Sequence, residues 1–339
     1  MTEIRKDPFT EQWIITGTEK EQEFFTSLAS QEKTEWKVCP FCPGNEKVSG
    51  KEIFALRTPG TAADTPGWEV RVIVSKQAAL QIETDPDRRP EGMYDLMSNV
   101  GAHEVIIETP EHVKNLSNLP IEQINKIFST YQSRMRDLEG DRRFKYALIF
   151  KNQRKGSKYR LCHAHSQLVA LPITPKTIKD ELHHSREYYS YKDRCLYCDV
   201  ITQELRDTKR VVEENDGYIA VTPFASRFPF EVWIMPKKHN CDFLKESQES
   251  LLNLAKIMKN SLLRIETVLD DPPLNFMLHS APYMREREGY WATIKDDYHW
   301  HIEITPQVLE LSGFEVGTGS QIQPLLPEVA AQLLREIKL

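Results

Sequence analysis

Apolar residues of the chain fall into short runs that alternate with two long amphipathic stretches. Through 121–138 and again through 251–268 they recur three and four positions apart, which predicts a helix in each stretch. A short apolar strand precedes each predicted helix and leaves through a turn that contains proline. Another apolar strand follows each helix, so the pattern predicts strand, helix and strand twice. The four predicted strand regions are 104–112, 146–151, 231–239 and 274–278.

Cysteine and histidine residues repeat in step with these elements. Each half places a Cys-x-x-Cys pair before its first strand, a histidine at the end of that strand and a His-x-His pair after its last strand. Three features in one order predict an internal duplication. Prolines and a polar run interrupt the pattern between the copies. We therefore predict an N-terminal half at 1–172, a linker at 173–194 and a C-terminal half at 195–339.

Length and composition agree with this organisation. The 339 residues give room for two domains or for one duplicated domain, and 40% hydrophobic with 28% charged residues is ordinary for a soluble globular protein. A net charge of -6 argues against broad nucleic-acid binding, which usually appears as a basic domain. No apolar run approaches the roughly 20 residues that span a membrane, and no secretory signal follows the N-terminus. A cytoplasmic protein with reduced thiols and no membrane partner is expected.

Clustered reduced cysteines with histidines are typical ligands of zinc, which takes four of them in a tetrahedron. Each half supplies two cysteines, the histidine at the strand end and one histidine of its His-x-His pair. Both predicted zinc sites are closed and hence structural, and the alternative for either cysteine pair is two buried thiols. The predicted ligands are Cys39, Cys42, His112 and His163 in the first half, and Cys195, Cys198, His239 and His299 in the second.

Four further histidines, His103, His183, His184 and His279, stand outside this ligand pattern. His183 and His184 are interpreted as surface or core residues. His279 is a candidate for lining a pocket.

The sequence His-Ala-His-Ser-Gln at 163–167 supplies candidate chemistry. If a metal holds His163, the same strand holds His165 in a fixed place, and neutral imidazole is a competent nucleophile near neutral pH. Gln167 faces the same side and can donate to a phosphate oxygen, as can Asn152 at the end of the preceding strand. We predict that His165 attacks phosphorus, and that only the first half is catalytic because no glutamine follows His301.

These residues resemble the galactose-1-phosphate uridylyltransferase family of the histidine-triad superfamily. The matching segments are 39–46, 109–112, 150–153, 163–167 and 313–319. The resemblance implies an α+β fold of two histidine-triad-like halves, with an antiparallel sheet and flanking helices, in a homodimer. It also implies ping-pong double displacement. His165 would carry the nucleotidyl group, His163 would bind zinc, Gln167 would contact phosphate and Glu315 would contact the hexose.

The stretch 153–162 departs from the family, whose members carry small residues there. Arginine, lysine and tyrosine replace them at unchanged spacing, so Lys158 and Arg160 are predicted to contact anionic groups of the substrate. A solvated charged turn is the alternative. Ser75 and the segment 17–20 also differ from nucleotide contacts of relatives. The segments 163–167 and 313–319 look more like the adenylyl-transferring branch, of the ADP-glucose phosphorylase type, than like the uridylyl branch.

The predicted function is a two-zinc nucleotidyltransferase that moves a nucleoside monophosphate, AMP in preference to UMP, through a nucleotidyl-histidine. The exchange runs between a nucleotide-activated sugar and phosphate or a sugar 1-phosphate, so its partners are small molecules. Two alternatives stay open. The basic loop also suits an enzyme that moves AMP from adenylylsulfate to phosphate, and a zinc-stabilised nucleotide-binding protein without catalysis would tolerate the loop. A dinucleotide hydrolase is disfavoured, since Gln167 replaces the histidine that donates a proton to the leaving group.

Overall fold

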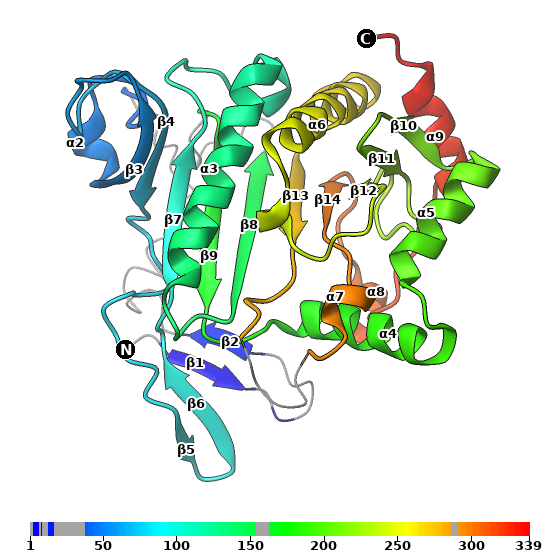
Figure 1. The fold of residues 1–339 in the computed structure, drawn as a ribbon, viewed down its shortest axis with the longest axis horizontal. Coiled ribbons are helices and arrows are strands. Elements are labelled where there is room, and N and C mark those ends of the chain that lie inside the picture. Colours follow the sequence, from blue (N-terminus) through cyan, green and yellow to red (C-terminus); the bar gives the residue numbers. More distant parts are fainter. Residues whose placement is uncertain (1–2, 7, 9–12, 17–37, 154–162, 286–290) are drawn as a thin grey trace.

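The fold combines helices with two antiparallel sheets (Figure 1). The computed structural model describes residues 3–339 except 7, 9–12, 17–37, 154–162 and 286–290. Over these residues the larger sheet has 10 strands in the order β10-β11-β12-β14-β13-β8-β9-β7-β4-β3. The smaller sheet has 4 strands in the order β2-β1-β6-β5. The predicted mixture of helices with antiparallel sheet is confirmed.

The N-terminal half supplies the whole smaller sheet and half of the larger one. The smaller sheet consists of β1 (Glu3–Lys6), β2 (Trp13–Thr16), β5 (Arg89–Glu91) and β6 (Tyr94–Ser98). The larger sheet receives β3 (Glu52–Arg57), β4 (Trp68–Val74), β7 (Ala102–Ile107), β8 (Tyr146–Gln153) and β9 (His165–Leu171). Its helices are the short α2 (Glu46–Ser49) and the long α3 (Ile121–Glu139), with a 3-10 turn at Leu116–Asn118.

The C-terminal half supplies the other strands of the larger sheet. They are β10 (Val211–Glu214), β11 (Tyr218–Val221), β12 (Val232–Pro236), β13 (Leu274–His279) and β14 (His301–Pro306). Helix α4 (Lys176–Lys192) precedes this half, whose own helices are α5 (Leu196–Asp207), α6 (Gln248–Val268), α7 (Ile294–Asp297), α8 (Gly313–Thr318) and α9 (Pro327–Glu336), with a 3-10 turn at Phe243–Lys245.

The two halves repeat one order of elements. A helix stands at the cysteine pair of each half, after the pair in the first half and starting within it in the second. Three strands of the larger sheet follow that helix, with β5 and β6 of the smaller sheet inserted among them in the first half, and a long helix then leads to a final pair of strands. Thus α2, β3, β4, β7, α3, β8 and β9 correspond in turn to α5, β10, β11, β12, α6, β13 and β14. The internal duplication predicted from the cysteines and histidines is therefore visible in the fold.

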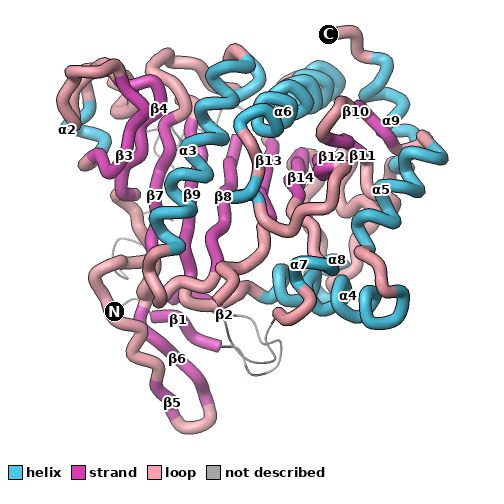
Figure 2. Tube along the Cα trace, in the orientation of Figure 1, coloured by secondary structure: helices cyan, strands magenta, loops and turns pink. Residues whose placement is uncertain are grey.

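The two long helices, α3 and α6, pack beside each other on one face of the larger sheet (Figure 2). Their apolar stripes bury Ile124, Phe128, Leu254 and Met258, which join Leu168 of β9 in the main core. Both predicted helices are confirmed. Because side chains alternate along a strand, burial of Leu168 under the helices turns His165 and Gln167 to the opposite face.

The halves join edge to edge through strands β8 and β13. These strands pair antiparallel from Leu274–Gln153 to Leu278–Ile149, so one continuous sheet runs through both copies. Two sheet edges that would otherwise expose unpaired backbone groups are closed in this way. Between the copies, the interval 173–194 contains helix α4, which packs against α5 and α7. Among the helices of the described residues, none is long and apolar enough to cross a membrane.

Candidate functional site

His165 is the first residue of β9 and is half-buried on the sheet face opposite the two long helices. Its Nδ1 lies 2.7 Å from the backbone oxygen of His163. A carbonyl oxygen only accepts, so Nδ1 carries the proton and Nε2 keeps its lone pair in the neutral ring. Phe41 packs edge-on against this ring, with centroids 5.3 Å apart, and limits its rotation. In this tautomer Nε2 is the ring atom through which a neutral imidazole can act as a nucleophile.

Gln167 and Asn152 lie on the same face as His165. Gln167 is two residues further along β9 and pairs with Phe150 of β8, and alternation carries that face on to Asn152. The Oε1 of Gln167 accepts a hydrogen bond of 2.8 Å from Nε2 of His103 on β7. Because the amide oxygen is engaged there, the amide N–H groups of Gln167 are turned to the open face. The structure thus brings the three predicted residues onto one surface.

His103 is a residue that the sequence did not assign to the site. It pairs with Val169 of β9, which is two residues after Gln167 and therefore on the same face of the sheet. Its hydrogen bond orients the Gln167 amide. The sequence signal was its place one residue before the strand 104–112, whose alternation predicts that it shares a face with Val105. That signal gains meaning only when the pairing of β7 with β9 is known.

A buried ion pair supports β9 from the helix side. Lys151 of β8 donates to the carboxylate of Glu108 at 2.6 Å and to the backbone oxygen of His165 at 2.9 Å. The side chains of Lys151 and Glu108 are 3% and 0% exposed. Tyr131 of α3 donates to Ser166 at 2.7 Å, which ties the same strand to the helix. The backbone at His165 is therefore fixed by side chains from β8 and α3.

The first group of predicted metal ligands is assembled. The donor atoms of Cys39, Cys42, His112 and His163 all lie within 4.8 Å of one another. Cys–His separations within it are 3.3 Å for Cys42–His112 and 3.6 Å for Cys39–His163. Tetrahedral zinc with normal bond lengths places sulfur and nitrogen roughly 3.6 Å apart. Nε2 of His163 donates to the Thr109 carbonyl at 2.8 Å, so its Nδ1 lone pair faces the two sulfur atoms. The residues fit a tetrahedral cation.

The second group repeats this geometry. The donor atoms of Cys195, Cys198, His239 and His299 also lie within 4.8 Å of one another. Cys198 Sγ is 3.4 Å from Nδ1 of His239 and 3.7 Å from Nδ1 of His299. Nε2 of His299 donates to the Pro236 carbonyl at 2.8 Å, at the place in the repeat where His163 uses Thr109. In both halves, therefore, the same Cys–His group and the same histidine–carbonyl hydrogen bond connect the loop at the strand end to the His-x-His segment.

His301 is the counterpart of His165 in the second half, and it is closed off. Its Nδ1 lies 3.1 Å from the His299 carbonyl, but its ring is 0% exposed and stacks on Trp233 with centroids 5.1 Å apart. Glu303 stands where the first half has Gln167. Burial would raise the pKa of Glu303, but His301, His279 and Arg227 hold this pKa at about 2. A buried carboxylate repels phosphate, so this half does not repeat the nucleophilic surface.

Glu181 and His279 complete a polar cluster around His301. His279 Nδ1 lies 3.0 Å from one oxygen of Glu181, while Tyr298 donates to the other at 2.9 Å. Donor atoms of Glu181, His279, His301 and Glu303 all lie within 4.8 Å of one another. His279, a candidate for lining a pocket, is instead buried in this cluster at 5% exposure. The sequence did not assign Glu181, which arrives from α4.

The other predicted residues lie away from these contacts or outside the described chain. His183 and His184 are exposed on α4, as expected for surface residues. Glu315 lies on α8, where its carboxylate accepts hydrogen bonds from the backbone and hydroxyl of Ser312. Its hexose contact stays a prediction. Lys158 and Arg160 fall within 154–162, outside the described residues.

Comparison with known proteins identifies relatives over the full chain. Two family models match, "Galactose-1-phosphate uridyl transferase, N-terminal domain" at residues 2–175 and its "C-terminal domain" at 181–339. The chain is 32% identical to an ADP-glucose phosphorylase of Arabidopsis thaliana, over 99% of this chain and 93% of that protein. It is 30% identical to a galactose-1-phosphate uridylyltransferase of Thermotoga maritima, over 99% and 98%. A crystal structure of the Arabidopsis ADP-glucose phosphorylase with bound ADP-glucose matches with a TM-score of 0.77 and 30% identity, covering 100% of both chains.

We expect Lys151→Met to lower the free energy of unfolding by about 3–5 kcal/mol, because it leaves the Glu108 carboxylate buried without its partner. Chemical denaturation measures the change. The matched control is Lys126→Met, since Lys126 and Glu69 are 39% and 48% exposed and such pairs contribute about 1 kcal/mol or less. Adding Glu108→Gln to Lys151→Met should recover part of the loss. A Lys151→Met cost no larger than that of the control would contradict the role given to the pair.

Proposed function

The chain belongs to the galactose-1-phosphate uridyl transferase family and is a nucleotidyltransferase, and we propose that it transfers AMP from an ADP-sugar to phosphate through His165. The observation that carries the covalent step is the tautomer of His165, whose Nδ1 hydrogen bond leaves the Nε2 lone pair on the sheet face of Gln167. The choice of an ADP-sugar rests on the likeness to a relative whose crystal structure holds ADP-glucose.

The proposed reaction has two displacements at one phosphorus atom. Nε2 of His165 attacks the α-phosphorus of ADP-glucose, and the P–N bond forms as the bond to the glucose 1-phosphate oxygen breaks. Glucose 1-phosphate leaves with its oxygen negatively charged. An oxygen of inorganic phosphate then attacks the same phosphorus, the P–N bond breaks, and ADP leaves. The histidine returns to its starting state, so no other reactant is required.

Charge at phosphorus needs hydrogen-bond donors that are in place before the reaction. The amide of Gln167, oriented by His103, and the amide of Asn152 are proposed to hold the non-bridging oxygens. Lys158 and Arg160 are proposed to contact the anionic part of the substrate, and Glu315 the hexose. His301 has no such role, because it is fully buried and a carboxylate stands beside it.

We propose that both Cys–His groups bind zinc and that these ions are structural. Each group offers four donors at tetrahedral spacing, which leaves no open position for substrate or water. Zinc bound to His163 would fix the carbonyl that accepts the hydrogen bond from His165. The ions would also stabilise the loops that carry the cysteine and histidine ligands.

We further propose a homodimer. Apolar side chains crowd the surface of the segment 309–326, which includes α8, although most large apolar residues elsewhere are buried. Monomers rarely expose so many together. The exposed residues are Leu309, Leu311, Phe314, Val316, Ile322 and Leu326.

We expect ADP-glucose labelled in adenine to leave one acid-labile, base-stable label on each chain, whereas ADP-glucose labelled in glucose leaves none. His165→Ala should abolish the label and lower phosphorolysis by about a thousandfold or more. His184→Ala is the matched control, because it removes an exposed histidine outside the site. Filter binding of the labelled protein and product analysis measure both effects.

If the wild-type protein takes up no label from any ADP-sugar, any UDP-sugar or adenylylsulfate, the proposal is overturned in favour of a nucleotide-binding protein. Stronger labelling by UDP-glucose would overturn the choice of AMP. Phosphorolysis of adenylylsulfate in place of ADP-glucose would move the leaving group from a sugar phosphate to sulfate.

We expect elemental analysis to find two zinc ions in each chain, one for each Cys–His group. Cys42→Ser and Cys198→Ser should each remove one ion, because each deletes one of four ligands. Cys241→Ser should keep both, since this buried cysteine belongs to neither group. Removal of zinc by a chelator should lower the melting temperature. Zinc lost equally from Cys241→Ser would argue against the assigned ligands.

We expect light scattering to give twice the mass of one chain. Val316→Asp, at a side chain 74% exposed, should shift the protein toward monomer, because a charge cannot be buried unpaired in an apolar interface. Tyr191→Asp is the control, since Tyr191 is 84% exposed on α4. A wild-type mass of one chain would refute the homodimer.

A further inference from the structure

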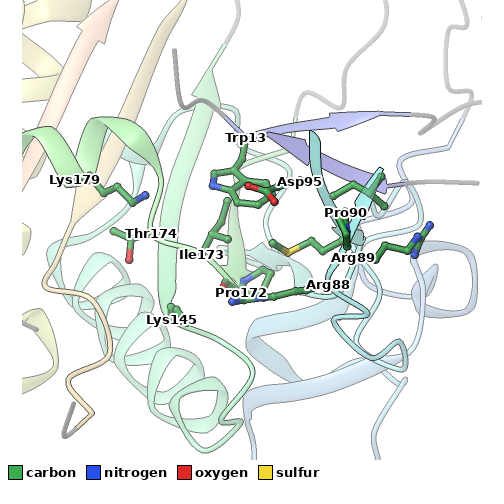
Figure 3. A pocket seen from close by; sticks show the side chains of 12 residues that line it. Trp13, Arg88, Arg89, Pro90, Asp95, Lys145, Pro172, Ile173, Thr174 and Lys179 are labelled. Atoms are coloured by element: carbon green, nitrogen blue, oxygen red, sulfur yellow. Dashed lines mark hydrogen bonds between the residues drawn. The ribbon is translucent and has the colours of Figure 1, made fainter. Parts of the chain in front are cut away.

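A cavity lies at the end of β9 that is remote from His165 (Figure 3). It measures about 390 Å³ and is lined by the smaller sheet, the residue before β8, the segment after β9 and helix α4. The segment after β9 contributes Pro172 to its wall. A strand advances about 3.3 Å for each residue, so Pro172 is about 20 Å from His165. No side chain spans that distance, and the cavity is a separate place from the reaction centre.

Positive charge is concentrated in this cavity although the whole chain carries -6. Three cationic side chains, Arg88, Lys145 and Lys179, line it together with one carboxylate, Asp95. Arg89 also lines it, but it pairs with Asp87 and with Glu3, and Figure 3 shows its guanidinium turned away. The cavity is therefore suited to an anion.

Two of these cations have little to satisfy them within the protein. Lys179 has no ion pair or side-chain hydrogen bond in the described part of the chain, and Figure 3 shows it extending from α4 toward Trp13. Arg88 makes one hydrogen bond of 3.2 Å, to the Pro172 carbonyl, and no ion pair with a described residue. Helix α4 starts at Lys176 without a side-chain cap, so its positive end adds to the same wall.

The other polar and aromatic side chains of the cavity determine which kind of molecule can carry the anionic group. Trp13 of β2 lines the cavity and is half-buried, so part of its indole is available for contact with an apolar surface. Asp95 of β6 has no ion pair with a described residue and can accept hydrogen bonds from hydroxyl groups. A carboxylate repels a second phosphate. The ligand should therefore be negative at one end and hydroxylated and neutral at the other.

We propose that this cavity binds a hexose phosphate. The phosphate lies among Lys179, Lys145 and Arg88, the C–H face of the sugar packs on Trp13, and Asp95 accepts from sugar hydroxyl groups. A cavity of about 390 Å³ is within the usual range for a small ligand. This site does not depend on the proposed reaction at His165, because it shares none of the residues of that centre.

Isothermal titration of the whole protein with glucose 6-phosphate tests the proposal. This probe has no phosphate on C1 and so cannot replace glucose 1-phosphate as a product. We expect saturable binding that Lys179→Glu weakens at least tenfold and that Arg88→Ala also weakens. Lys176→Glu is the matched control on the same helix, because Lys176 pairs with Asp180 and does not line the cavity. It should leave the affinity within about twofold of the wild type.

Further probes separate the parts of the ligand and the two sites. Trp13→Leu should weaken glucose 6-phosphate but leave inorganic phosphate unchanged, and glucose alone should not bind measurably. His165→Ala should bind glucose 6-phosphate as the wild type does. Absence of binding to the wild type, or binding lost in His165→Ala and kept in Lys179→Glu, would overturn the proposal. Equal affinity for inorganic phosphate, or tighter binding of AMP, would overturn the assignment to a sugar phosphate.

Discussion

The hydrogen bond from His165 Nδ1 to the His163 carbonyl, 2.7 Å long, is the interaction on which the proposed reaction depends. Even about 1 kcal/mol from one such bond biases the two neutral tautomers about fivefold, and its geometry also sets the direction of the Nε2 lone pair. The surrounding structure holds that carbonyl still. His163 is fixed on one side by the Thr109 carbonyl and the cysteine sulfur atoms. From the helix side of the sheet, Lys151 holds the carbonyl of His165 itself, two residues further along the chain. The buried Lys151–Glu108 ion pair on one face of the sheet thus fixes the backbone of His165, whose side chain lies on the other face.

The second half contains the counterpart of His165, and the surroundings of that residue differ from those in the first half. His301 forms the same bond to the residue two positions before it, yet aromatic rings cover it completely. Its Nε2 lies 3.8 Å from an oxygen of Glu303 in place of an open face, and that carboxylate keeps its charge because Arg227 and two histidines surround it. A histidine in this position is therefore not sufficient for reaction. The two copies differ in the residue two positions later, Gln167 or Glu303, and in whether the sheet face beside the histidine is open, and the proposed reaction needs the arrangement of the first copy.

Sequence pattern predicted the parts of this protein that repeat or that keep a regular period. The periods of α3 and α6 predicted both helices, and the spacing of cysteines with histidines predicted the two groups of residues that the fold brings together. The smaller sheet was missed, because its strands are only three to five residues long and β5 is exposed throughout. His103 and Glu181 were missed for another reason. Each meets its partners from a distant segment, and no local pattern reports the pairing of β7 with β9 or the packing of α4.

The seam between β8 and β13 also restricts how the molecule can move. Five consecutive register pairs cross it, from Leu274–Gln153 to Leu278–Ile149, and a common core lies beneath them. Rotation of one half against the other would break this ladder and expose strand edges, so hinge bending between the copies is closed to this fold. The proposed double displacement would have to release one product and admit a second substrate while its intermediate survives. With the two halves joined by this ladder, that exchange would have to take place without hinge bending between them.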